Sequence, residues 1–296
     1  MLKKKFAIIG TGIVGTALAV VLENKGLECI GVNTRSAKSY ENFCEYLPKK
    51  HLDLAQISLE ADLLFITTQD GSISKVAKKL TLLKQRKNAQ IWIHCSGSHK
   101  SAIMCHDPAL QVSYLSIHPL QAFASVENAL TLIPGTHFGV EGSDRQSEQY
   151  GEQLVSLLGG IPHKIDPEKK TLYHAGAVVA SNYLVSLVLM AVKLFEQAGI
   201  NREDALKSLL PLLHGSYQNI AKDGLARALT GPIARGDTEV VAKHLQEMPP
   251  DLQQIYKGLG SLALELGKEK KLVNQTSYSP EALERLEQLL ECHSNK

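Results

Sequence analysis

The stretch that decides the fold is "KFAIIGTGIVGTALAVVLENKG", residues 5–26, in which an apolar run meets three glycines and a helical pattern follows. A short apolar run that ends at glycine is typical of a buried strand. Gly10 permits a tight turn, Gly12 lets the backbone approach a pyrophosphate, and Gly15 allows close helix–strand packing. The start of the helix offers free N–H groups to phosphates. We therefore predict a dinucleotide-binding loop formed by Gly10, Thr11, Gly12, Ile13, Val14 and Gly15.

Composition narrows the class of protein. The chain has 296 residues, of which 44% are hydrophobic and 21% charged, as is ordinary for a globular protein of about two domains. A net charge of +2 gives no field that would favour nucleic acid or an anionic membrane. The five cysteines form no paired framework and no segment resembles a secretory leader, so we expect a reducing cytoplasm.

The chain changes character near Asp166. Before it, continuous apolar runs alternate with amphipathic stretches, which indicates a parallel sheet covered on both faces. After it, helical patterns run nearly to the end. We predict an α/β protein, with an N-terminal Rossmann-type parallel-sheet domain over 1–166 and an all-helical domain over 167–296. The expected strands are 5–10, 28–33, 61–68, 89–95, 112–118, 136–142 and 161–166.

One helical segment is nearly long enough to cross a membrane. Residues 175–192, "AGAVVASNYLVSLVLMAV", are almost wholly apolar. Ser181, Asn182 and Ser186 interrupt the run, and its first half is rich in Ala and Gly. We therefore expect a helix buried on all sides within the protein.

The end of the second strand selects the cofactor. An NAD site places an acid here to bind the ribose, whereas this chain has Asn33, Thr34, Arg35 and Ser36. Arg35 can pair with a 2′-phosphate, and the two hydroxyls can donate hydrogen bonds to it. The residues therefore favour NADP. The alternative is that Arg35 is a solvated cation and Ser36 only caps the next helix.

The substrate should lie beyond the carboxyl ends of the later strands. Ser96, Gly97 and Ser98 could hold a carboxylate, and His118 could donate a proton or a hydrogen bond to a carbonyl. His118 could equally be a structural imidazole in its His-Pro turn. Also at these strand ends are Thr67 and Thr68, expected near the cofactor, and Gln121, expected near the substrate.

The same region superficially suggests zinc, because "HCSGSHKSAIMCH", residues 94–106, contains three histidines and two cysteines. The spacing matches no common structural site, and neighbouring strand residues point to opposite faces. We therefore predict no metal site.

The helical half adds further polar candidates. His174 and Ser181 share one helix face, and Asn182 needs either a ligand or a bond across a helix contact. In "LTGPIARGDTEV", Arg235 could clamp a carboxylate, while Asp237 could cap the next helix or orient Arg235.

The motifs "GTGIVG", "NTRS", "CSGS", "HPLQAF", "YHAGAVVASNYL" and "GPIARGD" occur in this order over most of the chain. Together they resemble a family of Rossmann-like NADP-dependent oxidoreductases whose helical domain is related to that of 6-phosphogluconate dehydrogenase. The family includes an alternative type of ketopantoate reductase and is distantly similar to pyrroline-5-carboxylate reductases. The resemblance implies a homodimer built through the long helix, and it places Asn182 on the substrate opposite Ser96–Ser98.

One departure matters for catalysis. Better-known relatives carry a catalytic Lys four residues before the helix Asn, where this chain has Val178. We therefore name His118 or His174 as the proton donor, with Asn182 orienting the substrate. The expected activity is NADPH-dependent reduction of a small 2-keto carboxylate, 2-dehydropantoate to pantoate. An imine reductase of the pyrroline-5-carboxylate type and a non-enzymatic NADP-binding redox sensor remain alternatives.

Overall fold

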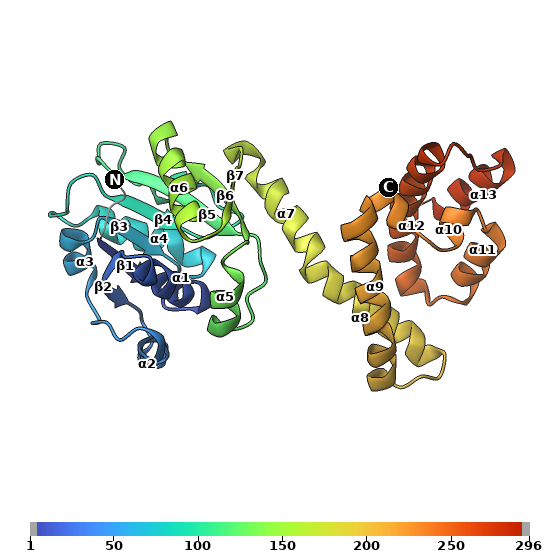
Figure 1. The fold of residues 1–296 in the computed structure, drawn as a ribbon, viewed down its shortest axis with the longest axis horizontal. Helices are drawn as coiled ribbons and strands as arrows, with labels where there is room; N and C mark the ends of the chain where they lie inside the picture. Colours follow the sequence, from blue (N-terminus) through green and yellow to red (C-terminus); the bar gives the residue numbers. More distant parts are fainter. Residues whose placement is uncertain (1–4, 292–296) are drawn as a thin grey trace. The chain divides into compact units, whose positions relative to one another are not determined.

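The N-terminal part of the chain is built around one seven-stranded sheet (Figure 1). The computed structural model describes residues 5–291. The strand order is β2-β1-β3-β4-β5-β6-β7, with β1 to β5 parallel, β6 antiparallel to β5, and β7 parallel to β6. The prediction of seven strands is confirmed. Strands β1 to β5 run parallel to one another, whereas β6 and β7 run in the opposite direction. The strands are β1 (Lys5–Ile9), β2 (Glu28–Asn33), β3 (Leu63–Ile66), β4 (Ile91–His94), β5 (Ser113–Pro119), β6 (His137–Gly142) and β7 (Ile161–Lys164).

Helices cover both faces of the sheet. Alternation along β1 shows the two layers, because Phe6 and Ile8 join the core beneath α1, α2, α5 and α6, whereas Ala7 and Ile9 join the core beneath α3 and α4. All four of these side chains are at most 2% exposed. The helices are α1 (Ile13–Asn24), α2 (Ala37–Tyr46), α3 (Leu54–Glu60), α4 (Asp70–Thr81), α5 (Val126–Leu132) and α6 (Arg145–Leu157), with a short 3₁₀ turn η1 (Ser101–Met104).

The chain forms two compact units, residues 1–181 (unit 1) and 182–296 (unit 2). Unit 1 therefore keeps the 3₁₀ turn η2 (Pro167–Lys169) and helix α7 (Lys170–Ala180), which the predicted boundary at 166 assigns to the second domain. The reason is packing: Lys170, at the start of α7, is 2% exposed and bonded to strands β5 and β6.

Unit 2 is helical throughout its described part. Val241, Leu264, Leu286 and Leu290 form its larger core, and Val192 packs with Ala205 and Leu209 in a smaller one. Its helices are α8 (Asn182–Gln197), α9 (Arg202–Ala228), α10 (Pro232–Arg235), α11 (Thr238–Glu247), α12 (Pro250–Val273) and α13 (Pro280–Leu290). Helix α9 departs from helical geometry at Gly224, which has a φ of 76°.

The long apolar segment is not buried, so the expectation of a helix enclosed on all sides is wrong. Pro167–Gln197 is long and apolar enough to span a membrane, yet only 6% of its most apolar window is buried. Val179 is 57% exposed and Val185 is 70% exposed. Among residues 5–291 this is the single such segment, and length and composition alone are weak evidence for a span.

Candidate functional site

The glycine turn lies where the strand order reverses, between β1 and β3, which is the usual ligand position in an open parallel sheet. Gly10 has a φ of +104°, a backbone conformation that favours glycine. A Cβ on Gly15 would stand 2.3 Å from the carbonyl oxygen of Gly10, so the helix can approach the turn only because Gly15 has no side chain. A Cβ on Gly12 would meet nothing within 4 Å. The turn therefore leaves open space at the middle glycine.

The amino end of α1 faces this open space without a side chain of its own. Gly12 is the N-cap residue, and no described side chain caps the helix there. The first N–H groups of the helix are thus available to an anion. Ile13 and Val14 pack partly into the core. The residues present fit a pyrophosphate.

Three threonines surround the turn in different ways. Thr67 donates to the carbonyl oxygen of Gly10 at 2.6 Å, and Thr11 donates to the carbonyl oxygen of Ser39 at 3.0 Å. Both hydroxyls therefore make hydrogen bonds within the protein. The buried hydroxyl of Thr68 has no hydrogen-bond partner among the described residues. An unpaired buried hydroxyl is costly unless a ligand satisfies it, so Thr68 suits a contact with a bound nucleotide.

The segment after β2 presents a free cation. Asn33 donates its side-chain amide to Leu52 (2.7 Å), and the Thr34 carbonyl oxygen contacts Nε2 of His51 (3.0 Å). Ser36 caps α2 by accepting from the Ser39 amide at 3.3 Å, as its alternative role predicts. Arg35 is exposed and forms no ion pair with any described residue.

The Ser96–Ser98 loop is held by a carboxylate of the protein. Ser96 donates to Oδ2 of Asp70 at 2.8 Å, and Ser98 donates to the same atom at 3.1 Å. The Ser96 hydroxyl also accepts from the backbone amides of Ser98 and His99. Both hydroxyls therefore have partners within the protein, and a negative charge lies beside the loop that the sequence assigns to a substrate carboxylate.

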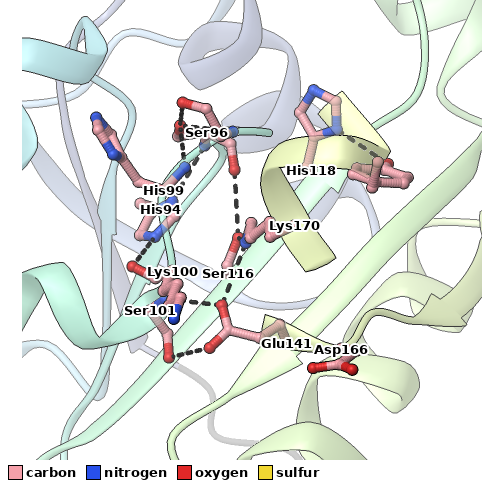
Figure 2. Close-up of polar contacts among 12 residues, drawn as sticks. His94, Ser96, His99, Lys100, Ser101, Ser116, His118, Glu141, Asp166 and Lys170 are labelled. Carbon is pink, nitrogen blue, oxygen red and sulfur yellow. Dashed lines mark hydrogen bonds and ion pairs between the residues drawn. The ribbon is translucent and has the colours of Figure 1, made fainter. Parts of the chain in front are cut away.

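His118, at the end of β5, meets the first turns of α7 (Figure 2). Its Nδ1 lies 3.0 Å from the Tyr173 hydroxyl, and its ring centroid lies 6.0 Å from that of His174. A Cβ on Gly97 would stand 2.8 Å from Nε2 of His118 and 2.5 Å from Cδ2 of His174. The structure thus brings together Gly97, His118 and His174, three of the predicted site residues, and adds Tyr173.

Burial dominates the electrostatics of His118. Burial, followed by the charges of His174 and Lys170, lowers the pKa of His118 to about 4, whereas Asp70 opposes the shift. The imidazole is therefore neutral near pH 7 and can donate a hydrogen bond but carries no acidic imidazolium proton.

A buried polar network beneath this site is absent from the sequence-based predictions. Figure 2 shows Lys170 donating to Ser116 and to Glu141, the latter at 3.2 Å. Glu141 also accepts from the amide and the hydroxyl of Ser101, each at 2.7 Å. Ser116 donates to the carbonyl oxygen of Ser96 at 3.4 Å. The sequence signal that could have indicated this network is Glu141, a charged residue within the otherwise largely apolar strand segment "HFGVEG".

The remaining predicted residues lie elsewhere. Gln121 is exposed and accepts from the Ala122 amide, and Ser181 donates to the Ala177 carbonyl oxygen at 2.7 Å. Asn182 is exposed at the start of α8 in unit 2. In the same unit, Arg235 donates through Nε to Asp237 at 2.8 Å, so Asp237 orients Arg235 although its side chain does not cap α11.

Two histidines of the zinc-like segment, His94 and His106, have other partners. His94 accepts from the Ser96 amide through Nδ1 (3.1 Å), and its Nε2 lies 3.2 Å from the Lys100 carbonyl oxygen. His106 contacts Ser74. Residues 5–291 contain no cluster of three or more side chains suited to hold a metal ion.

These features define a unit with a Rossmann-like fold, followed in the chain by a helical unit. A family model described as a Rossmann-like domain matches residues 2–119, and a second model, DUF2520, a domain of unknown function, matches residues 136–263. No curated protein matches the chain by sequence.

Solved structures share the fold over almost the whole chain. A Bacteroides fragilis protein designated an NADP oxidoreductase is 22% identical, with a TM-score of 0.70 over 89% of this chain and 98% of its own. A Thermotoga maritima protein is 26% identical, with a TM-score of 0.63 over 94% and 98%. The Plasmodium falciparum pyrroline carboxylate reductase with NADP bound is 12% identical, with a TM-score of 0.55 over 98% and 100%. At these identities the likeness shows the fold.

Proposed function

We propose that the protein is an NADPH-dependent oxidoreductase. The observation that carries this proposal is the open space at Gly12 beside the uncapped amino end of α1, with the unpaired Arg35 after β2. The N–H groups of α1 would hold the pyrophosphate, and Arg35 with Ser36 the 2′-phosphate. The bound nucleotide would supply the hydride. Similarity to proteins named for NADP supports the choice of cofactor.

Reversing the charge at Arg35 tests the cofactor assignment. In the Arg35→Asp variant the new carboxylate would repel a 2′-phosphate, so we expect NADPH affinity to fall about 100-fold while NADH affinity changes little. Fluorescence titration with both nucleotides measures the two dissociation constants. Lys25→Asp, at an exposed cation just after α1, is the matched control. Equal losses for NADPH and NADH, or no loss, would refute the assignment.

The substrate that we propose is a small 2-keto carboxylate, 2-dehydropantoate, which would be reduced to pantoate. His118, neutral and beside Gly97, would donate a hydrogen bond from Nε2 to the carbonyl oxygen as negative charge develops there. The proton that completes the alcohol would then come from His174 or from water. Asn182 and Arg235 would orient the substrate and bind its carboxylate. This assignment rests on the family resemblance of the sequence.

A specific observation favours a second candidate, an imine reductase. Asp70, bonded to Ser96 and Ser98, puts negative charge at the loop and would stabilise a protonated imine better than a ketone. Parallel assays of NADPH oxidation with 2-dehydropantoate and with pyrroline-5-carboxylate decide between the two. Tight NADPH binding without turnover of either substrate would instead favour a redox sensor.

We further propose that the protein is a cytoplasmic homodimer. Unit 2 leaves many large apolar side chains exposed on α8, α9 and α12, including Val185 (70%), Leu212 (65%) and Leu262 (58%). Burying one such side chain contributes about 1.5–3 kcal/mol, so a second copy could cover these faces with substantial gain. Four described cysteines are free, as suits a reducing compartment.

A charge on α8 tests the dimer. Val185→Glu should weaken association about 100-fold or more, because both copies lose the apolar contact and bury a charge. Leu82→Glu, at a residue 74% exposed in unit 1, is the control. Sedimentation velocity over a concentration series reads the result. A wild-type protein that stays monomeric throughout would contradict the proposal.

A further inference from the structure

Lys170 and Glu141 form an ion pair inside unit 1 where both side chains are only 3% exposed. Removing two charges from water costs several kcal/mol each, and their attraction often only offsets that cost. Burial lowers the pKa of Lys170, and the nearby Glu141 opposes the shift. Since such a pair contributes little net stability, its placement is better explained by the geometry it imposes.

That geometry involves the residues one helical turn away. Lys170 is the first residue of α7, and side chains three and four positions later lie on the same face of a helix. Those positions are Tyr173, which contacts His118, and His174, which lies beside His118 and approaches Gly97. Binding Lys170 to Glu141 and Ser116 therefore turns this face of α7 onto the ends of β5 and β6.

Tyr173 has a second contact that fixes the place of its ring. The phenol oxygen lies against Gly139 in β6. A Cβ on Gly139 would stand 2.8 Å from that oxygen, so the close approach depends on glycine. A phenol has one hydrogen to donate and a neutral imidazole accepts at its unprotonated nitrogen, so the Tyr173 hydroxyl can donate to Nδ1 of His118, 3.0 Å away.

We propose that Lys170 and Glu141 are positioning residues for the site: their ion pair seats α7 so that Tyr173 donates to Nδ1 of His118, which leaves Nε2 as the N–H donor beside Gly97. The catalytic consequence rests on the proposed reductase function, whereas the position of the hydrogen on His118 does not. The groups that face His118 are Tyr173, His174 and Lys170 from α7 and Asp70 from α4.

The experiment reads the tautomer of His118 directly. Long-range ¹⁵N–¹H correlation spectra of histidine-labelled protein at pH 7.5 distinguish hydrogen on Nε2 from hydrogen on Nδ1, with His118→Gln assigning the signals. We expect one Nε2–H form in the wild type. Tyr173→Phe and the double variant Lys170→Met/Glu141→Gln should both give a mixture of tautomers. Lys5→Met/Glu28→Gln removes an exposed pair (45% and 59%) and should change nothing.

Kinetics provide the second measurement. The double variant should lose at least about 10-fold in kcat, while its dissociation constant for NADPH stays within about twofold, because the pair is not placed at the nucleotide. Lys170→Arg, which keeps the charge, should retain more of the Nε2–H signal than the double variant does. If the double variant does not fold, Glu141→Gln alone replaces it, since its amide oxygen can still accept from Ser101.

Two results would overturn the proposal. One is a wild-type His118 with hydrogen on Nδ1, and the other is a folded Lys170 or Glu141 variant with the wild-type tautomer and kcat. Failure of the reductase function looks different: NADPH would not bind or no substrate would turn over, and the tautomer measurements would remain valid.

Discussion

The Gly97→Ala substitution tests whether the two imidazoles beside the loop take part in the reaction. The new Cβ would stand 2.5 Å from Cδ2 of His174 and 2.8 Å from Nε2 of His118, whereas ordinary contacts begin near 3.4 Å. His174 must therefore retreat by about 0.9 Å and His118 by about 0.6 Å, taking 3.4 Å as the limit. His118 cannot yield freely, because Tyr173 holds its other ring nitrogen.

A displacement near 1 Å in a catalytic group can cost about 100-fold in rate, which corresponds to about 2.7 kcal/mol of activation free energy. Overpacking of this kind destabilises a fold by about 1–3 kcal/mol, so the variant should remain folded. We expect Gly97→Ala to lower kcat about 100-fold with NADPH affinity unchanged. Steady-state kinetics, nucleotide titration and urea unfolding measure the three quantities.

Gly71→Ala provides the control, because a Cβ at that exposed position in α4 meets nothing within 4 Å. The reasoning would fail if Gly97→Ala kept the wild-type kcat. It would also fail if the variant lost NADPH binding and kept turnover at saturating nucleotide, since the imidazoles would then serve the cofactor and not the substrate.

The glycine turn and the buried histidines support two further predictions. Gly12→Val should keep the wild-type stability but lose NADPH binding, because its side chain fills the space left for phosphate. Gly15→Ala should instead destabilise the fold, because its Cβ clashes with the carbonyl oxygen of Gly10. Urea unfolding measures the stability of each variant, and nucleotide titration measures its NADPH binding. Burial lowers the pKa of His94 to about 3 and that of His118 to about 4, below the ordinary 6.5, so the unfolded chain binds more protons. The free energy of unfolding should fall as the pH drops below about 6.5, by up to about 1.4 kcal/mol per pH unit for each histidine, and His94→Gln should flatten the curve; rising stability would contradict this.

The strands and the glycine turn could be read from the sequence because their signals are local. A buried parallel strand must be a continuous apolar run, and Gly10, Gly12 and Gly15 lie within six consecutive residues whose spacing has one steric explanation. Arg35 follows the same logic, since the end of β2 lies at a fixed distance from the turn. Each of these inferences needs only neighbours in the chain.

The direction of β6 and the exposure of α7 and α8 could not be inferred in this way. A short apolar run has the same pattern in parallel and antiparallel pairs. An apolar helix has the same composition whether its partner is its own core or another surface. The sequence therefore does not reveal that only 6% of the most apolar window of Pro167–Gln197 is buried. What covers such a helix depends on the packing of distant segments.

Local pattern established the Rossmann unit, its glycine turn and the absence of an acid after β2. Three-dimensional packing alone joined Glu141, Ser116 and Lys170, and it turned Ser96 and Ser98 toward Asp70. The reason is that hydrogen bonds and ion pairs between residues 26 to 54 positions apart depend on where the strands and α7 meet. Neighbouring residues in the chain do not determine where these elements meet.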